Sequence, residues 1–201
     1  YEFFFISTVL ASLVSLIIIF SIIVEPSNLT QTSSGKNFLE LLKNKKLRLV
    51  CMIMFLVGGS FLTCLNFTAV FTKSINVKPI TIFFLSYTTI ALIMRIFFGW
   101  LPDKYGQVTF CKPALIFYGI SIGILGLSLN FIGVMIAGLL FGVSHALVYP
   151  SIYTLALRFT DLSNKSKAFS ICSVSFTSGG MIFSVIYGLI AETYSFKVMF
   201  L

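Results

Sequence analysis

Charged and small residues gather at the end of one apolar run. They are Arg95, Gly99, Asp103, Lys104 and Gly106. Arg95 and Gly99 are four residues apart and share one face of a helix, and Gly106 permits a tight turn. The Asp103 carboxylate can accept hydrogen bonds from the exposed N–H groups of a neighbouring helix start. The spacing therefore predicts a polar contact between helix ends, and the alternative is an ordinary polar turn between two buried helices.

Uncharged polar residues lie inside the apolar runs, where each is costly in lipid and should face the interior of a helix bundle. The candidates for a polar path through such a bundle are Thr63, Asn66, Thr88, His145, Tyr149 and Tyr153. His145 is the only histidine, and an imidazole, with an unperturbed pKa of about 6.5, can exchange protons at physiological pH. The alternative for His145 is a neutral side chain bonded to a neighbouring helix.

The sequence shows no combination of residues that is typical of an enzyme active site. The chain has no Ser–His–acid combination and no phosphate-binding Gly-Lys-Ser/Thr loop, so we expect no catalysis, no ATP hydrolysis, no cofactor and no metal. The widely spaced Cys51, Cys64, Cys111 and Cys172 include no Cys-x-x-Cys pair. They indicate buried, reduced thiols rather than a metal site or a disulfide framework.

Composition places the protein in a membrane. Of its 201 residues, 58% are hydrophobic and 10% are charged, and the mean hydropathy is +1.03; a soluble domain is about one quarter charged. The net charge of +8 suggests nucleic acid at first. The basic residues nevertheless cluster in short loops between apolar runs, which is typical of membrane proteins, and we expect no nucleic-acid partner.

The apolar runs predict about six transmembrane helices and the start of another. They cover residues 3–24, 49–72, 80–101, 113–129, 131–157 and 168–191, with 198–201 as the further start. The first run, at about 1.5 Å per residue, can cross the ~30 Å hydrocarbon layer. The expected fold is therefore an all-α, polytopic membrane helix bundle.

The longest polar stretch, residues 25–48, separates the first two runs. Within it, residues 37–47 predict an amphipathic helix on the membrane surface, with Phe38, Leu41, Leu42 and Leu47 toward lipid or protein and the lysines toward anionic headgroups. The alternative is a plain helical lead-in to the next span.

Lysine and arginine set the expected orientation. Ten of them fall in residues 25–48, 102–112 and 158–167, whereas three fall in the loops of the other side. The positive-inside rule therefore predicts that these three segments are cytoplasmic.

The segment 95–106 resembles the signature loop of the major facilitator superfamily of secondary transporters. The resemblance rests on Arg95, Gly99, Leu101, Pro102, Asp103, Lys104 and Gly106. The family usually continues with basic residues where this chain has Gln107 and Val108, a departure that suits the weaker copy of the loop in the second half of such transporters. In the family the loop is a cytoplasmic latch that steadies one conformation. Arg95 is expected to serve this latch, and the alternative is substrate binding.

The resemblance also implies a domain organisation. Residues 1–24 would be the last helix of the N-terminal half, 25–48 the cytoplasmic linker, and 49–201 an incomplete C-terminal half, so we expect the chain to begin within a longer protein. Small residues let membrane helices approach closely. The glycines expected to pack helices together are Gly138, Gly142, Gly179 and Gly180.

The function that the resemblance implies is secondary active transport of a small organic solute by alternating access across the cell's inner membrane. The expected partners are the lipid bilayer, the solute and the missing N-terminal half. Because the loop resembles that of bacterial sugar- or drug-efflux types, we expect a proton-coupled antiporter that exports its solute. The alternatives are a metabolite uptake carrier, a non-transporting sensor or channel with this fold, and a membrane-embedded enzyme.

Overall fold

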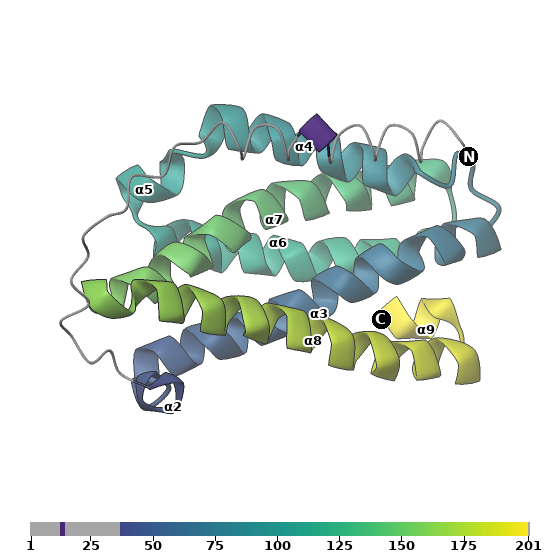
Figure 1. Ribbon diagram of the computed structural model, residues 1–201. Helices are drawn as coiled ribbons and strands as arrows, with labels where there is room; N and C mark the ends of the chain where they lie inside the picture. The colour runs from purple at the N-terminus through teal and green to yellow at the C-terminus, as the bar shows by residue number, and fades with distance from the viewer. Residues whose placement is uncertain (1–12, 15–36, 201) are drawn as a thin grey trace. The chain divides into compact units, whose positions relative to one another are not determined.

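The computed structural model describes residues 13–14 and 37–200. The chain divides into two units, Tyr1–Ser34 and Gly35–Leu201. In the described part of the second unit, all regular secondary structure is helical (Figure 1). The expected first span at residues 3–24 lies outside the described residues except for the helical pair 13–14. The linker residues 25–36 lie outside them as well.

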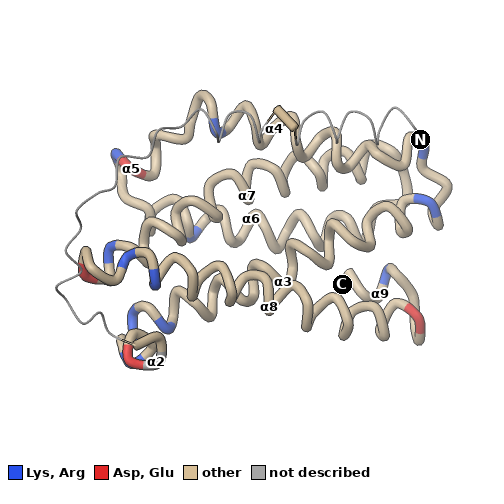
Figure 2. The backbone as a smooth tube through the Cα atoms, in the orientation of Figure 1, with Lys and Arg blue, Asp and Glu red and all other residues tan. Residues whose placement is uncertain are grey.

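Five long helices of the second unit match the remaining expected spans. They are α3 (Lys45–Ser74), α4 (Ile82–Phe98), α6 (Gln107–Leu127), α7 (Phe131–Arg158) and α8 (Lys165–Thr193). The helices α3, α6 and α7 are long and apolar enough to cross a membrane, and so is α8 when the turn before it is included. The helix α4 is shorter. With 17 residues, α4 measures about 25 Å. Figure 2 shows the charged residues mostly near the helix ends, so the prediction of an all-α membrane bundle is confirmed.

Asparagine side chains begin two of these helices. The Asn44 side chain accepts a hydrogen bond from the Lys46 amide at 3.0 Å, and the Asn130 side chain accepts one from the Gly133 amide at 2.8 Å. Each bond satisfies an amide that the first turn of a helix leaves unpaired. The cap at Asn130 explains how α7 starts so soon after α6 ends.

Two expected boundaries differ from the structure. The span expected at residue 113 begins at Gln107, because the break falls at Gly106, whose φ is 98°, and Pro113 lies inside α6. The expected helix at 37–47 is not continuous: α2 covers only Phe38–Leu41, and α3 begins after the Asn44 cap. Leu41 and Leu47 are buried within the protein, so these two side chains pack on the bundle.

The described unit is built from packed helix pairs. α3 lies beside α8, and α7 packs against both α4 and α6 (Figure 1). The short α9 (Phe196–Phe200) contacts α8 and α6, where the expected further span begins. At one end of the bundle, the Asn44 side chain donates to the Phe159 carbonyl at 2.9 Å, which joins the start of α3 to the end of α7. The cytoplasmic side of this end stays a prediction.

Candidate functional site

The signature loop forms a short helix between two breaks. Gly99 ends α4, the helix α5 covers Leu101–Tyr105 with Pro102 at its second position, and Gly106 precedes α6. Proline is tolerated in the first turn of a helix because its missing N–H has no partner there. The loop is therefore helical rather than the turn that the sequence predicts, and Asp103 lies four residues before Gln107, with the break at Gly106 between them.

Two hydrogen bonds join this loop to the end of α7. Gln107 Nε2 donates to Oδ1 of Asp103 at 3.3 Å, and Arg158 Nη1 donates to Oε1 of Gln107 at 2.8 Å. Gln107 is buried with 7% of its surface exposed, whereas Asp103 and Arg158 are exposed. The amide uses its acceptor for the cation and its donor for the carboxylate, which is the orientation that both charges favour. We call these three residues the Asp103–Gln107–Arg158 chain.

The other charges of the loop have separate surroundings. Arg95 lies exposed in the last turn of α4 and borders a pocket of about 210 Å³ together with Tyr87 and Thr88. Within residues 37–200, the Asp103 carboxylate accepts a hydrogen bond from Gln107 rather than from Arg95. Lys104 Nζ lies 5.2 Å from the ring centroid of Trp100, within the range of a cation–π contact.

A small cavity of about 70 Å³ lies where the loop packs on α7. Gly99, Asp103 and Gln107 border it from the loop side, and Pro150 and Ser151 border it from α7. The Ser151 hydroxyl is buried without a hydrogen-bond partner among the described residues. The loop is therefore seated on the last third of α7 both by the hydrogen-bond chain and by packing.

His145 lies in a cluster of aromatic rings in the middle of the bundle. Its imidazole stacks on Phe61 of α3 with ring centroids 4.2 Å apart and an angle of 12°. Tyr87 of α4 and Tyr149 of α7 lie 6.0 and 5.4 Å from it. His145 is 4% exposed, and its Nδ1 has no hydrogen-bond partner within residues 37–200. The expected inward placement therefore agrees with the geometry, whereas the expected bond to a neighbouring helix is not seen at Nδ1.

The two tyrosines that follow on the same face extend this cluster along α7. The Tyr149 hydroxyl donates to the Tyr153 hydroxyl at 3.4 Å, and the Tyr153 hydroxyl shares a hydrogen bond with Ser173 Oγ of α8 at 3.0 Å. His145, Tyr149 and Tyr153 thus form a continuous row that links α7 to α3 and α8.

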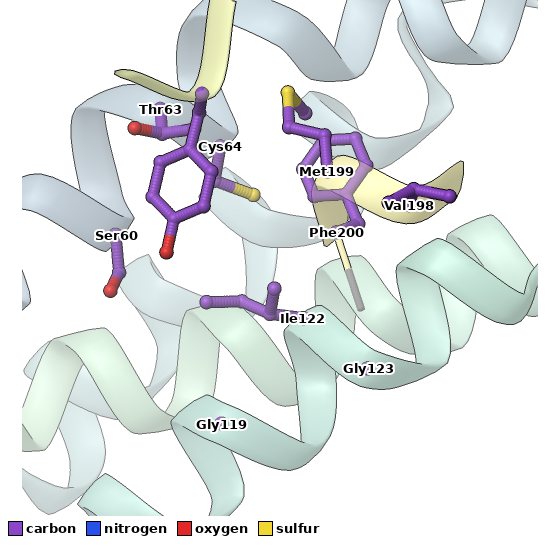
Figure 3. Close-up of a pocket in the computed structure, with 10 residues that line it drawn as sticks. Ser60, Thr63, Cys64, Gly119, Ile122, Gly123, Val198, Met199 and Phe200 are labelled. Atoms are coloured by element: carbon purple, nitrogen blue, oxygen red, sulfur yellow. The ribbon is translucent and has the colours of Figure 1, made fainter. Parts of the chain in front are cut away.

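The remaining path candidates do not join this row. Thr63 borders a separate cavity of about 330 Å³ between α3, α6, α8 and α9, and Figure 3 shows Thr63 there with Ser60, Gly119 and Gly123. Asn66 Nδ2 donates to Ser184 Oγ of α8 at 3.2 Å. Thr88 donates to the Phe84 carbonyl of its own helix at 2.7 Å. Within residues 13–14 and 37–200, no cluster of three or more His, Cys, Asp or Glu side chains could hold a metal.

Comparison with protein families decides the class. The model described as the Major Facilitator Superfamily matches residues 1–161 and, in an overlapping match, residues 80–201. The chain belongs to the major facilitator superfamily. No curated protein matches it. Membership makes the protein a multi-pass membrane transporter of this superfamily, and the resemblance stated from the sequence is confirmed.

Glycines bring the helices of this superfamily member close together. A Cβ at Gly138 would lie 2.7 Å from the Phe83 carbonyl oxygen, and one at Gly142 would lie 2.5 Å from that of Tyr87, both on α4. A Cβ at Gly179 would collide with the Phe55 carbonyl of α3, and one at Gly180 with the Leu62 side chain. All four glycines therefore lie at close approaches between helix backbones or side chains.

Several residues of the site were not selected from the sequence. Gln107 was noted only as a departure from the family pattern, and Arg158 was counted only as a loop charge. Asp103 and Gln107 are four residues apart, but Gly106 interrupts the helix between them, so the i, i+4 spacing rule of a continuous helix does not by itself predict their hydrogen bond. Arg158 is 51 positions from Gln107, and no local pattern links them. Gly58 packs against the Phe176 backbone. Like the four selected glycines, it is a small residue at a close contact between two helices.

Proposed function

We propose that this protein exports a small organic solute in exchange for protons by alternating access. The observation that carries this proposal is the Asp103–Gln107–Arg158 chain, which ties the signature loop to α7 at one end of the bundle. In alternating access, two bundles rock about a central site, so that helix ends close on one side while they open on the other. Contacts that form at only one of the two ends therefore favour one state of this equilibrium.

The chemistry of a latch follows from the charges of the loop. Gln107 bonds Oδ1 of Asp103, and Oδ2 is left to accept hydrogen bonds from helix ends of the other half when the two halves close. A hydrogen bond to a charged group contributes about 1.5–3 kcal/mol, which corresponds to roughly a 10- to 100-fold change in a two-state equilibrium. Gln107 and Arg158 orient the carboxylate, and Asp103 makes the contact.

The support for proton coupling is His145. Its imidazole is buried among rings, with Nδ1 unbonded within residues 37–200. A buried cation without a partner is costly, so His145 would hold a proton only while an anionic group of the other half pairs with it. A solute that displaces this anionic group would release the proton, and this competition between solute and proton is what exchange requires.

The direction of transport rests on the resemblance of the loop to that of efflux-type members. The test uses inside-out membrane vesicles that contain the full-length protein and are acidified inside, with a pH-sensitive dye and a panel of small organic solutes. Export predicts that an added solute enters the vesicle and drives protons out, which alkalinises the lumen. Vesicles without the protein are the control. A solute that moves protons only in right-side-out vesicles would indicate uptake, and the absence of any solute-driven proton flux would contradict the proposal.

A further inference from the structure

α3 and α8 run alongside each other with very close backbones. A Cβ at Gly58 of α3 would collide with the backbone of Phe176 of α8, and one at Gly179 of α8 would collide with the backbone of Phe55 of α3. Further along, Asn66 of α3 bonds Ser184 of α8. From the Gly58–Phe176 contact through Leu62–Gly180 to Asn66–Ser184, residue numbers rise together on both helices, so the two helices are parallel.

A pair of cysteines lies in the same interface, seven residues before the two glycines. Cys51 precedes Gly58, and Cys172 precedes Gly179, so each cysteine shares the interface face of its helix. The two Sγ atoms are 3.7 Å apart, and both thiols are free. This contact joins positions 121 residues apart in the sequence, which is why cysteine spacing alone did not reveal it.

The geometry is compatible with a covalent bond between these sulfurs. A disulfide has an S–S length of about 2.05 Å, so the sulfurs, now 3.7 Å apart, need to approach by roughly 1.7 Å. Rotation about the side-chain torsions supplies such a movement where the backbones are already close. The packed glycines nearby keep the helices at that separation.

Only one of the two thiols borders a space that a small molecule can enter. Cys51 lines a pocket of about 440 Å³ that also contains Arg48 and Ser175, whereas Cys172 is completely buried at 0% exposure. The positively charged Arg48 guanidinium lies in the same pocket. This charge favours the thiolate form of Cys51. Cys51 is therefore the thiol that meets an oxidant, and Cys172 is placed to react with the product.

We propose that Cys51 and Cys172 form a redox modification site that hydrogen peroxide converts into a disulfide between α3 and α8. The Cys51 thiolate attacks one peroxide oxygen, an S–O bond forms, the O–O bond breaks, and the leaving hydroxide is protonated to water. The Cys172 thiolate then attacks the sulfenic sulfur, the S–S bond forms, and the S–O bond breaks with loss of a second water. With hydrogen peroxide, two thiols are oxidised by two electrons in total and the peroxide is reduced to two waters.

The bond would fasten α3 to α8 near the end where both helices begin. Because the helices are in contact before oxidation, the disulfide needs no change in their arrangement. Reduction by a dithiol would restore the two thiols, so the modification is reversible. This inference does not depend on the direction of transport or on the solute.

The test treats membranes that contain the full-length protein with hydrogen peroxide, blocks remaining thiols under denaturing conditions, and maps the peptides by mass spectrometry. The expected result is a linked pair of peptides that carry Cys51 and Cys172, abolished by dithiothreitol. Of the four thiols in residues 1–201, these two are lost to the blocking reagent, while Cys64 and Cys111 still react with it.

Variants separate this pair from general oxidation. Cys51→Ser or Cys172→Ser should remove the linked peptide, and Cys64→Ser should leave it, because the Cys64 thiol contacts Thr68 of its own helix. The proposal is overturned if Cys51 and Cys172 remain fully reactive toward the blocking reagent after peroxide treatment. It is also overturned if Cys51 is oxidised to the sulfinic acid without any linkage to Cys172.

Discussion

At the scale of single residues, the site depends on a neutral amide between two charges. Gln107 stands where the superfamily usually has a basic residue, and Arg158 supplies a positive charge from α7 instead. Asp103 is therefore linked to a cation through the Gln107 amide and does not contact the cation directly through this chain. The exposed carboxylate remains accessible to groups outside the described unit.

The first prediction concerns this amide. Gln107→Leu keeps an apolar body in the buried position but removes both hydrogen bonds, so Asp103 and Arg158 lose their orientation. We expect the rate of solute-driven proton flux to fall about 10-fold at equal protein level, which corresponds to ~1.4 kcal/mol. Val108→Leu, at the exposed neighbouring position, is the matched control and should retain the wild-type rate. Equal rates for the two variants would show that the amide does not orient the latch.

The second prediction concerns His145. His145→Gln keeps a polar side chain but removes the imidazole, which can gain and lose a proton. If the imidazole carries the exchanged proton, the variant loses the wild-type dependence of transport rate on pH. Ser144→Ala is the control, because this buried hydroxyl bonds only the Leu140 carbonyl of its own helix among the described residues. An unchanged pH profile in His145→Gln would make His145 a packing residue.

Sequence reasoning succeeded at this scale where neighbours are close in the chain. The inward position of His145 followed from the cost of an imidazole in lipid, and its row with Tyr149 and Tyr153 followed from helical spacing. The partners from other helices, Phe61, Ser173 and Arg158, are tertiary contacts that no local pattern specifies. Thr63 and Asn66 share a helical face, yet one borders a cavity and the other bonds α8.

At the scale of elements, glycines determine how closely the helices pack. The third prediction compares Gly142→Leu with Gly119→Leu. A side chain at Gly142 would press on Tyr87 and Ile90 of α4, whereas a Cβ at Gly119 meets no atom within 4 Å among the described residues. Overpacking costs about 1–3 kcal/mol, or a melting temperature lower by roughly 2–12 °C. Thermal unfolding in detergent should show this loss for Gly142→Leu and a smaller one for Gly119→Leu; an equal loss would contradict the α4–α7 packing.

The helices themselves were largely predictable, because apolar length determines which segments cross a membrane. Their ends were less so. Pro113 looked like a boundary, but Gly106, with its positive φ, provides the break and the proline is accommodated within α6. The helix expected at 37–47 is interrupted because the Asn44 side chain starts a new helix at Lys45, and its place on the membrane surface stays a prediction.

At the scale of the whole molecule, the end of the bundle that carries the signature loop also carries the start of α3 and the end of α7. The fourth prediction places this end in the cytoplasm. In a background without native cysteines, Ser163→Cys should be shielded from an impermeant thiol reagent in intact cells, and Ser74→Cys should be labelled. Both serines are exposed, so a cysteine at either position can be reached by the reagent from its own side of the membrane. Labelling of Ser163→Cys from outside would reverse the orientation.

The latch is the central claim about the whole transporter, and Asp103→Asn tests it most directly. The measurement is solute-driven proton flux in vesicles that contain equal amounts of full-length wild-type or variant protein. Glu40→Gln, which removes an exposed acid of α2 next to the same end, is the control. The account predicts that Asp103→Asn inserts normally and lowers the flux about 10- to 100-fold, the effect of losing hydrogen bonds to a charged group, while Glu40→Gln is unaffected. Wild-type flux in Asp103→Asn would contradict it.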